Sequence, residues 1–393
     1  MKRVKSKSNK NKNIKYYELK SLNDLKDSWK DYLALSYNFE KQSYELKPIT
    51  NFIEKGIKPV KKVWLTNNTS FTCTEDHRLF TVARKTSPYE VKEVRVKELI
   101  TDSRKHYLDN HFILTANHIP PLGTYEENLD LLWVKGLYTA EGWSESNHTC
   151  IANDDLILRN KVESIFIKNN IPYSNSKRIK NAYQSVRKSS FQQELKELGN
   201  NAFNKEFPPK YLSTNKEGTL ALLEGNIDGD GHRCPQKPNY NKKIIYSTSS
   251  EKFVNQLFFM NLLVNKPLTI YKCVHHGGIG EKPIWRLYEN TKNRQLKSYL
   301  NGVGKVGVKR IEDVEPEEVF DITVQENHNF VLWNGVIAHN CDDFANFNPY
   351  VAYSALDYDC YVVFILDLGN IHVAHAISYG WEEPEKLNCH VWD

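Results

Sequence analysis

The chain has 393 residues, of which 40% are hydrophobic, and a net charge of +5 at pH 7, a length that allows two or three domains with their own cores. It shows no apolar run long enough to cross a bilayer, no signal-peptide pattern and no CxxC pair among its seven cysteines, so a membrane partner, a zinc site and a disulfide framework are not indicated. We therefore expect a protein of the reducing cytosol.

Residues 1–15 contain seven Lys and Arg residues, no acidic residue and almost nothing apolar, so alone they should be disordered. The charge of the remaining chain is uneven. Residues 341–393 have a net charge of −8, which leaves +13 for residues 1–340. The basic part fits a polyanion such as DNA, the arm fits an acidic partner segment, and both also fit a solvated Lys-rich surface.

From Tyr16 to about Val82 the sequence predicts strands, because β-branched and aromatic residues lie between Asn and Ser turns, as in VWLTNN and SFTCTEDHRLFTV. Residues 83–130 are transitional. Within them, VKEVRVKELI is an amphipathic stretch, and HIPPLGTYEENLD reads as a linker into a new domain because Pro and Gly punctuate it.

Two segments of the next part repeat one pattern: LLWVKGLYTAEGW (131–143) and LALLEGNIDGDGHR (220–233). Each is expected to be an apolar helix with small residues one turn apart, which lets two helices approach closely. Each ends in an acid followed by a glycine, and Gly142 and Gly231 suit helix C-caps.

Packing these two helices face to face would bring Glu141 and Asp230 together at the helix ends. Paired carboxylates beside DNA phosphates can bind Mg²⁺, which activates water and stabilises a leaving oxygen. Two buried structural helices with capping acids are the alternative. We therefore predict a magnesium site at Glu141 and Asp230, with this alternative open.

The tripeptide His339-Asn340-Cys341 carries a different chemistry. The amide nitrogen of Asn340 can attack its own backbone carbonyl, close a five-membered imide and cut the chain after itself. The Cys341 thiol can receive an acyl group from elsewhere, and His339 can donate a proton to the carbonyl or to the leaving amine. Upstream, Asn334-Gly335 is a tight-turn dipeptide that is expected to join the last two strands.

Read as a whole, VFDITVQENHNFVLWNGVIAHNC (319–341) resembles the C-terminal splicing region of inteins, the self-excising protein-splicing elements. Thr74-Glu75-Asp76-His77 resembles the TxxH motif that inteins place beside their N-terminal scissile peptide. The resemblance implies that Thr74 and His77 act on that peptide, that Asp321 assists acyl transfer, and that His328 assists cyclisation of Asn340.

Inteins begin with Cys or Ser on a short strand, whereas this chain joins the family pattern downstream of that strand, after Met1 and the basic arm. We therefore expect a split intein divided close to its N-terminus. The partner would be a short N-terminal segment on a separate polypeptide, docked by strand addition. A degenerate or truncated gene that no longer splices is the alternative.

The repeated helices resemble the LAGLIDADG homing endonucleases, which often sit inside inteins. Each copy is followed by text that reads strand, helix, strand, in residues 152–180 and 247–273. The resemblance implies β-sheets that form a saddle on double-stranded DNA. It also implies supporting basic residues, for which we expect Lys188 and Lys282, although each also fits a solvated surface lysine.

Three positions depart from that family and leave DNA cleavage in doubt. Glu141 stands where the family usually has Asp. Lys135 and Glu224 stand where apolar or small residues are common.

Residues 341–393 follow the expected cut and should be the downstream host protein, the C-extein. CDDFANFNPYVAYSALDYD is predicted as a helix, and CYVVFILDL and IHVAHAISYG as strands. Cys at a helix start followed by His on a strand resembles the transglutaminase-like cysteine peptidases. That resemblance implies Cys341 as nucleophile and His375 as base, with Asp393 as the candidate third member. A hydrogen-bonded strand residue is the alternative for His375.

The expected fold is multidomain: an all-β, horseshoe-like splicing domain interrupted by an α/β endonuclease, plus a short α+β extein fragment. The expected segments are the arm 1–15, the splicing domain 16–115 and 301–340, the endonuclease 116–300, and the extein 341–393. We expect a monomer that splices without a cofactor and cuts DNA with Mg²⁺. A homing endonuclease with decayed splicing and an inert DNA-binding relic are the alternatives.

Overall fold

The computed structural model describes residues 16–83, 90–99, 111–145, 148–177, 182–187, 189–230, 243–275, 282–289, 300–340, 362–367, 372–377 and 391–392. The chain divides into two compact units, Met1–Asn340 and Cys341–Asp393. Within the described ranges, no helix is both long and apolar enough to cross a membrane.

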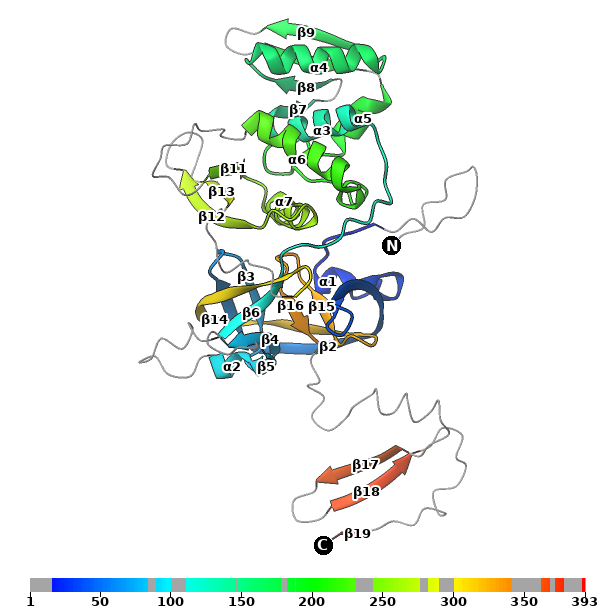
Figure 1. The fold of residues 1–393 in the computed structure, drawn as a ribbon, viewed down its shortest axis with the longest axis vertical. Helices are drawn as coiled ribbons and strands as arrows, with labels where there is room; N and C mark the ends of the chain where they lie inside the picture. The colour runs from blue at the N-terminus through cyan, green and yellow to red at the C-terminus, as the bar shows by residue number, and fades with distance from the viewer. Residues whose placement is uncertain are drawn as a thin grey trace. The chain divides into compact units, whose positions relative to one another are not determined.

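The first unit contains a nine-stranded antiparallel sheet built from two stretches that lie far apart in the sequence (Figure 1). The strand order is β1-β2-β14-β6-β4-β16-β15, with β3 paired to β2 and β5 paired to β4. The strands are β1 (Leu33–Asn38), β2 (Ser43–Leu65), β3 (Ser70–Cys73), β4 (Arg78–Ala83), β5 (Val91–Arg95), β6 (His111–Ala116), β14 (Val303–Val324), β15 (Asn329–Val331) and β16 (Ile337–His339).

The longest pair in this sheet is β2 with β14, which have 23 and 22 residues. Their register runs from Ile49 opposite Val324 to Leu65 opposite Val308, with four shifts along the way. Such bulges bend and twist a ribbon. One end of the ribbon can therefore pack into one hydrophobic cluster, through Leu65 and Val308, and the other end into a second, through Ile49 and Val324.

Short helical segments interrupt the regions for which the sequence predicts strands or an amphipathic stretch. The helix α1 (Leu22–Leu25) begins at Ser21, whose side chain accepts a hydrogen bond from the Asp24 N–H, and η1 (Trp29–Asp31) follows. The amphipathic VKEVRVKELI splits into β5 and the helix α2 (Val96–Leu99).

An α/β part is inserted in the sequence between β6 and β14, which are themselves neighbours in the sheet (Figure 1). It has a four-stranded sheet of order β7-β8-β10-β9 and a three-stranded sheet of order β11-β13-β12. Its elements are α3 (Leu129–Glu141), β7 (Gly142–Ser144), β8 (Thr149–Ala152), α4 (Leu156–Lys168), β9 (Tyr173–Lys177), β10 (Ala182–Val186), α5 (Ser190–Lys196), η3 (Tyr211–Ser213), α6 (Lys216–Asp230), β11 (Lys243–Thr248), α7 (Glu251–Leu263), β12 (Leu268–His275) and β13 (Lys282–Glu289). The predicted strand-helix-strand order after each long helix is present.

Gly142 follows α3 as predicted, but not as a left-handed C-cap. Its backbone is extended, with φ −98° and ψ 153°. A Cβ at this position would lie 2.0 Å from the Tyr138 ring. Glycine is therefore needed here for space rather than for a positive φ. Gly231 lies outside the described residues.

The core of the α/β part continues into the splicing sheet. Ala116 and Ile119 belong to the same hydrophobic cluster as α3, α6 and α7. The Ile119 N–H donates to the Leu262 carbonyl at 3.1 Å, and the Phe258 ring meets the Trp333 ring edge-on at 5.8 Å. Helix α7 therefore packs directly against the turn between β15 and β16.

The second unit contains a three-stranded antiparallel sheet of β17 (Val362–Asp367), β18 (His372–Ile377) and β19 (Val391–Trp392). The first two strands fall in the segments for which the sequence predicts strands. The helix predicted from Cys341 onward lies outside the described residues.

Candidate functional site

The turn before Asn340 has the backbone geometry expected of an Asn-Gly dipeptide. The Gly335 N–H donates to the Leu332 carbonyl at 2.9 Å, and Gly335 has a φ of +83°, which an L side chain rarely adopts. The Asn334 side chain accepts a hydrogen bond from the Val336 N–H at 3.2 Å. The predicted Asn-Gly turn is therefore present, and it sends β16 back along β15.

Strand β16 also pairs with β4, where Ala338 lies opposite Leu79. Two residues before Leu79, the TxxH turn is closed by the His77 N–H, which donates to the Thr74 carbonyl at 3.2 Å. The His77 carbonyl accepts from the Val96 N–H at 3.0 Å, so the start of α2 supports the turn. Segments more than 250 residues apart in the sequence thus meet in one site.

His339 and Asn340 end this strand in a buried setting, with 6% and 4% of their surface exposed. The Nδ1 atom of His339 contacts the backbone carbonyl oxygen of Asn340. On its other side, Nε2 lies 3.5 Å from a carboxylate oxygen of Glu93, and the ring stacks at a tilt on Phe80 with centroids 5.1 Å apart. The imidazole is therefore held at the carbonyl whose cleavage the sequence predicts.

Asn340 is oriented by two hydrogen bonds. Its backbone N–H donates to the His328 carbonyl at 3.0 Å, and its Nδ2 donates to the Val324 carbonyl at 3.3 Å. Its Oδ1 is buried and has no hydrogen-bond partner among the described residues. Burying an amide oxygen without a hydrogen bond costs free energy, and such costs are typical of functional sites.

His328 has a φ of +50°, a left-handed conformation that is uncommon for residues other than glycine. The next residue holds this backbone in place: the fully buried Asn329 accepts from the Tyr37 N–H at 2.8 Å and donates to the Tyr37 carbonyl at 2.8 Å. Asn329 thus pairs with Tyr37 as a neighbouring strand would, and fixes β1 beside the His328 turn.

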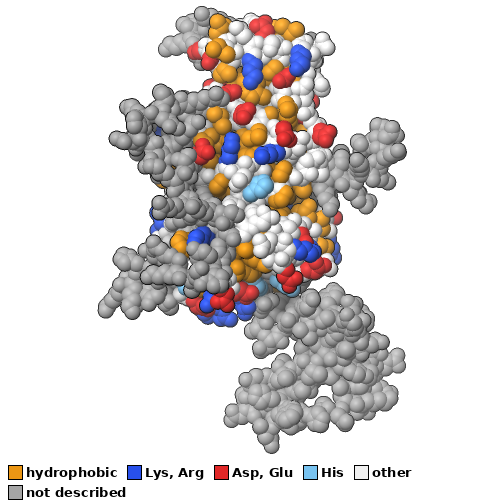
Figure 2. All heavy atoms as spheres, viewed as in Figure 1, with side chains coloured by type: hydrophobic (Ala, Val, Ile, Leu, Met, Phe, Trp, Pro, Cys, Tyr) orange, Lys and Arg blue, Asp and Glu red, His pale blue; other side chains and the backbone are white. Residues whose placement is uncertain are grey.

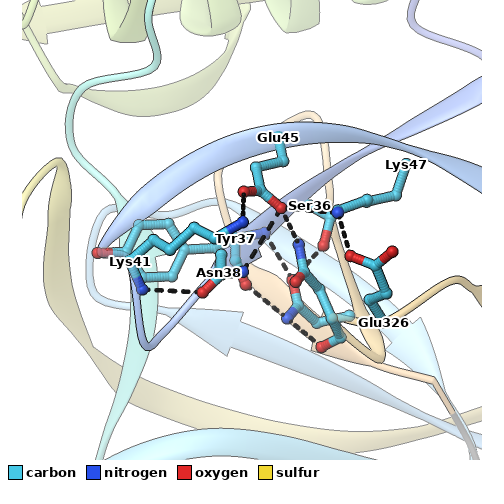
Figure 3. Close-up of polar contacts among 9 residues, drawn as sticks. Ser36, Tyr37, Asn38, Lys41, Glu45, Lys47 and Glu326 are labelled. Carbon is cyan, nitrogen blue, oxygen red and sulfur yellow. Dashed lines mark hydrogen bonds and ion pairs between the residues drawn. The ribbon is translucent and has the colours of Figure 1, made fainter.

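Charged groups extend this attachment outward (Figure 3). Glu45 receives hydrogen bonds from Lys41 at 3.1 Å and from Asn327 at 3.3 Å, and Lys47 lies 3.0 Å from it and also pairs with Glu326. The hydrogen bonds from Lys47 and then Lys41 lower the pKa of Glu45 to about 2. The β1–β2 hairpin is thereby tied to the turn that precedes His328.

Asp321 lies on β14 opposite Ile53 and is 4% exposed. Its Oδ1 accepts from the Ile322 N–H at 2.8 Å, and its Oδ2 lies 3.5 Å from the Lys55 ammonium group. Both side chains are nearly buried, so the charge of Asp321 is balanced inside the protein.

His77 is partly buried in this site. Loss of hydration, followed by the charges of His339 and Lys55, lowers the pKa of His77 to about 4. His77 is therefore neutral at pH 7 and can donate one N–H hydrogen bond without carrying a charge.

The structure thus places Thr74, His77, His328, His339 and Asn340 around one pair of strands, with Asp321 linked to them through Lys55. Cys341 lies outside the described residues. Sequence reasoning missed three residues here: Lys55, Glu93 and Asn329. Only Asn329 had a local signal, as the neighbour of His328 in ENHNF.

The paired helices α3 and α6 approach each other to backbone contact. A Cβ on Gly136 would lie 2.0 Å from the Leu222 carbonyl oxygen, and one on Gly225 would lie 2.0 Å from the Trp133 carbonyl oxygen. The predicted role of the small residues is confirmed, because no larger side chain fits between the helices without moving them.

At the helix ends, a Cβ on Gly229 would lie 2.6 Å from Ala140 Cβ and 3.0 Å from Glu141 Cγ. Glu141 is thus next to the residue that precedes Asp230, the last residue of α6, whose side chain is not among those described. Glu141 is partly exposed, and Mg²⁺ is commonly held by one or two carboxylates together with phosphate oxygens. The described part of the end therefore fits the predicted metal, although no cluster of three or more metal-binding side chains occurs among the described residues.

Two positions that depart from the expected motif have structural explanations. Lys135 is completely buried and forms ion pairs with Glu127 and, at 2.5 Å, with Glu194. Its charge is therefore compensated inside the α/β part. Glu224 is exposed on α6, so its charge faces solvent.

The two lysines predicted to support the metal site are at the edge of what the structure describes. Lys188 lies outside the described residues, and only the backbone of Lys282 is described, as the first residue of β13. On the face drawn in Figure 2, Lys and Arg side chains are scattered among acidic and apolar ones rather than gathered in one patch. In the second unit, His375 lies on β18 opposite Phe364, while Cys341 and Asp393 are outside the described residues.

Residues 3–340 match the family model described as the intein splicing domain. The chain belongs to the intein splicing domain family. This agrees with the meeting of the TxxH turn and the His-Asn end, which the sequence predicts for an intein.

Two curated relatives resemble this intein. An uncharacterized protein, MJ1054, from Methanocaldococcus jannaschii is 22% identical over 374 residues, covering 82% of this chain and 41% of that protein. The ATP-dependent DNA helicase Hel308 from Thermococcus kodakarensis is 28% identical over 170 residues, covering 36% of this chain and 15% of the helicase. The intein chain thus spans less than half the length of both relatives.

Solved structures resemble it more remotely. The homing endonuclease I-DmoI in complex with DNA and Mn is 12% identical, with a TM-score of 0.30, and covers 42% of this chain and 93% of that one. A variant of the Ssp DnaB mini-intein is 12% identical, with a TM-score of 0.23, and covers 81% of this chain and 87% of that one. Scores this low do not establish a shared fold.

Proposed function

We propose that this intein acts by protein trans-splicing: it is the C-terminal part of a split intein, and a short segment on a separate polypeptide completes it. The observation that supports the proposal best is the contact of His339 Nδ1 with the Asn340 carbonyl oxygen, on a strand paired beside the TxxH turn. The seven positive charges of residues 1–15 would favour an acidic segment as the partner.

The first two steps move an acyl group. The first residue of the partner segment attacks the carbonyl carbon of the peptide bond before it, and the nitrogen of that bond becomes the free amine of the same residue. Neutral His77 donates a hydrogen bond to the scissile peptide, with Thr74 beside it. The Cys341 thiolate then attacks the new ester or thioester and releases the first nucleophile, and Asp321 assists this transfer.

The last two steps release the intein. Asn340 Nδ2 attacks the carbonyl carbon of its own residue, the imide closes, and the amine of Cys341 leaves. His339 is placed to protonate the carbonyl oxygen or the leaving amine, and His328 assists. The free amine of Cys341 then attacks its own thioester, so a peptide bond forms and the thiol is regenerated.

The proposal is tested by mixing the chain with a synthetic peptide, in which a few upstream host residues precede the Cys-led segment of the neighbouring reading frame, and measuring product masses. Wild type should give a ligated product and a freed intein. Asn340→Ala should give no ligated product, whereas Asn175→Ala, at an exposed position on β9, should behave as wild type. Ligation by Asn340→Ala, or none by wild type, would contradict the proposal.

We further propose that the α/β part is a LAGLIDADG-type homing endonuclease that cuts double-stranded DNA at the intein-free host gene. The backbone contact of α3 with α6, which ends beside Glu141, supports this assignment. Glu141 and Asp230 would hold Mg²⁺, which supplies an activated water and stabilises the leaving oxygen. Lys188 and Lys282 remain predictions as supporting residues.

Cleavage of intein-free host DNA tests this second activity. Glu141→Gln should abolish it and the control Glu224→Gln, on the exposed face of α6, should not. DNA cleavage without any ligation would favour an endonuclease whose splicing has decayed. Inactivity in both assays would favour an inert DNA-binding relic.

Residues 341–393 are proposed as the C-extein of a transglutaminase-like cysteine peptidase. Cys341 would then serve splicing first and host catalysis later, with His375 as its base and Asp393 as the third member. Alkylation of Cys341 in the ligated host, compared with His375→Ala, tests whether the thiol is activated.

A further inference from the structure

A β-bulge in the long ribbon turns one lysine toward the splicing site. Gly56 lies opposite Val319 and Glu54 lies opposite Phe320, so Lys55 is the extra residue on β2. Gly56 has a φ of +70°, yet a Cβ at this position would meet nothing within 4 Å. Glycine is therefore required by the backbone of the bulge and not by crowding.

The bulge gives the Lys55 side chain a different environment from those of the residues that follow it on the strand. Ile57 is 76% exposed and Lys58 is exposed, whereas the Lys55 side chain is only 9% exposed and its ammonium group lies 3.5 Å from Asp321 Oδ2. Lysine is almost never buried in this way unless it is paired. Bulges next to active sites commonly re-aim a side chain, which is the geometry seen here.

Lys55 connects Asp321 with the TxxH turn, to which the proposed mechanism assigns the first steps. The charge of Lys55 acts on His77, the residue of the TxxH turn, together with that of His339. Asp321 is fixed from both sides, since one carboxylate oxygen accepts the Ile322 N–H and the other faces Lys55. No hydrogen bond or ion pair described for Asn340 involves Lys55.

We propose that Lys55 is a positioning residue for the acyl-transfer steps: aimed by the bulge at Gly56, its ammonium group fixes the orientation of the Asp321 carboxylate. The inference rests on the proposed splicing function and assigns a role to a residue that the motifs of the sequence do not mark. The inference predicts that the loss of Lys55 slows acyl transfer but leaves the cyclisation of Asn340 unchanged.

The test measures the two halves separately in the full chain, with the same synthetic peptide, upstream residues followed by the Cys-led segment, as the probe. Thiol-induced release of the upstream peptide reports acyl transfer, and release of residues 341–393 reports cyclisation. Lys55→Met should slow the first by about tenfold or more and change the second by less than about twofold. The control Lys58→Met, at an exposed position on the same strand, should leave both within about twofold of wild type.

Three further variants distinguish a positioning role from a folding defect. Lys55→Arg keeps the charge and should recover part of the acyl-transfer rate, and Gly56→Asn should keep more of it than Gly56→Ala because Asn tolerates a positive φ. Acyl transfer in Lys55→Met equal to that in Lys58→Met would overturn the inference, as would an equal loss in both halves. A wild-type chain that releases no upstream peptide would overturn the proposed function and this inference together, whereas a defect of Lys55→Met in neither half would overturn only the latter.

Discussion

Replacing Gly225 with Ala adds one methyl group where the backbones of α3 and α6 touch. The new Cβ would lie 2.0 Å from the Trp133 carbonyl oxygen, whereas ordinary van der Waals contact begins at 3.4 Å, so the helices must separate locally by about 1.4 Å. The hydrogen bonds from Trp133 to Asp228 and from Asn226 to Thr139 cross this interface, each 2.8 Å long, and both would be lost at that separation.

The substitution has destabilising and stabilising effects, so their sum decides the sign of the change in stability. Overpacking costs about 1–3 kcal/mol, and the two hydrogen bonds contribute about 1 kcal/mol each. Against this, Ala is about 1 kcal/mol better than Gly inside a helix. The net expectation for Gly225→Ala is a destabilisation of about 2–4 kcal/mol, although helix propensity alone would make the variant more stable.

Hydrogen exchange of the α3 and α6 amides is the suitable assay, because it reports local opening without assuming that the whole chain unfolds in one step. Gly225→Ala should speed exchange in both helices and lower DNA cleavage, while the adjacent control Glu224→Ala, which faces solvent, should change neither. Slower exchange in Gly225→Ala would refute the reasoning, since it would show that helix propensity outweighs the contact.

Four other outcomes are expected. Asn329→Leu should destabilise the splicing sheet by about 3 kcal/mol in chemical denaturation and slow release of residues 341–393, because Tyr37 loses two hydrogen bonds. Trp333→Ala should cost about 1–3 kcal/mol in the same assay, since it removes a ring that packs on α7. Lys135→Met should lower the melting temperature, because two partly buried carboxylates lose their partner. The pKa of His77 is lower in the folded chain than its ordinary value of 6.5, so the unfolded state binds the proton first and stability should fall as the pH drops from 6.5 toward 4, a slope that His77→Gln should reduce in pH-dependent denaturation.

Much of the architecture could be predicted from local sequence patterns. The small residues at Gly136 and Gly225 marked the contact of two helices, and Asn334-Gly335 marked the final turn, because both depend on properties of the residue itself: the absence of a side chain, or tolerance of a positive φ. His77 and Asn340 could be selected because their chemistry is rare and their surroundings in the sequence are typical of inteins.

The partners of these residues could not be predicted in the same way. Glu93 lies in a stretch that reads only as amphipathic, and it reaches His339 because β5 pairs with β4, which in turn pairs with β16. Lys55 is turned inward by a register shift against β14, whose residues are more than 250 positions away. Gly56 within the strand is a sign of an irregularity, but a bulge depends on how two distant strands fit each other, so the sequence of β2 alone does not show that Lys55 turns inward.

The packing of α7 on the turn around Trp333 has a consequence for how an intein of this kind can evolve. If α7 were deleted together with the rest of the α/β part, the Trp333 ring beside the strand that ends at Asn340 would lose its packing partner and face water. Selection for splicing alone would then be enough to preserve that helix, whether or not the α/β part cleaves DNA. Retention of the inserted part in a related intein would therefore not show that it is an active nuclease.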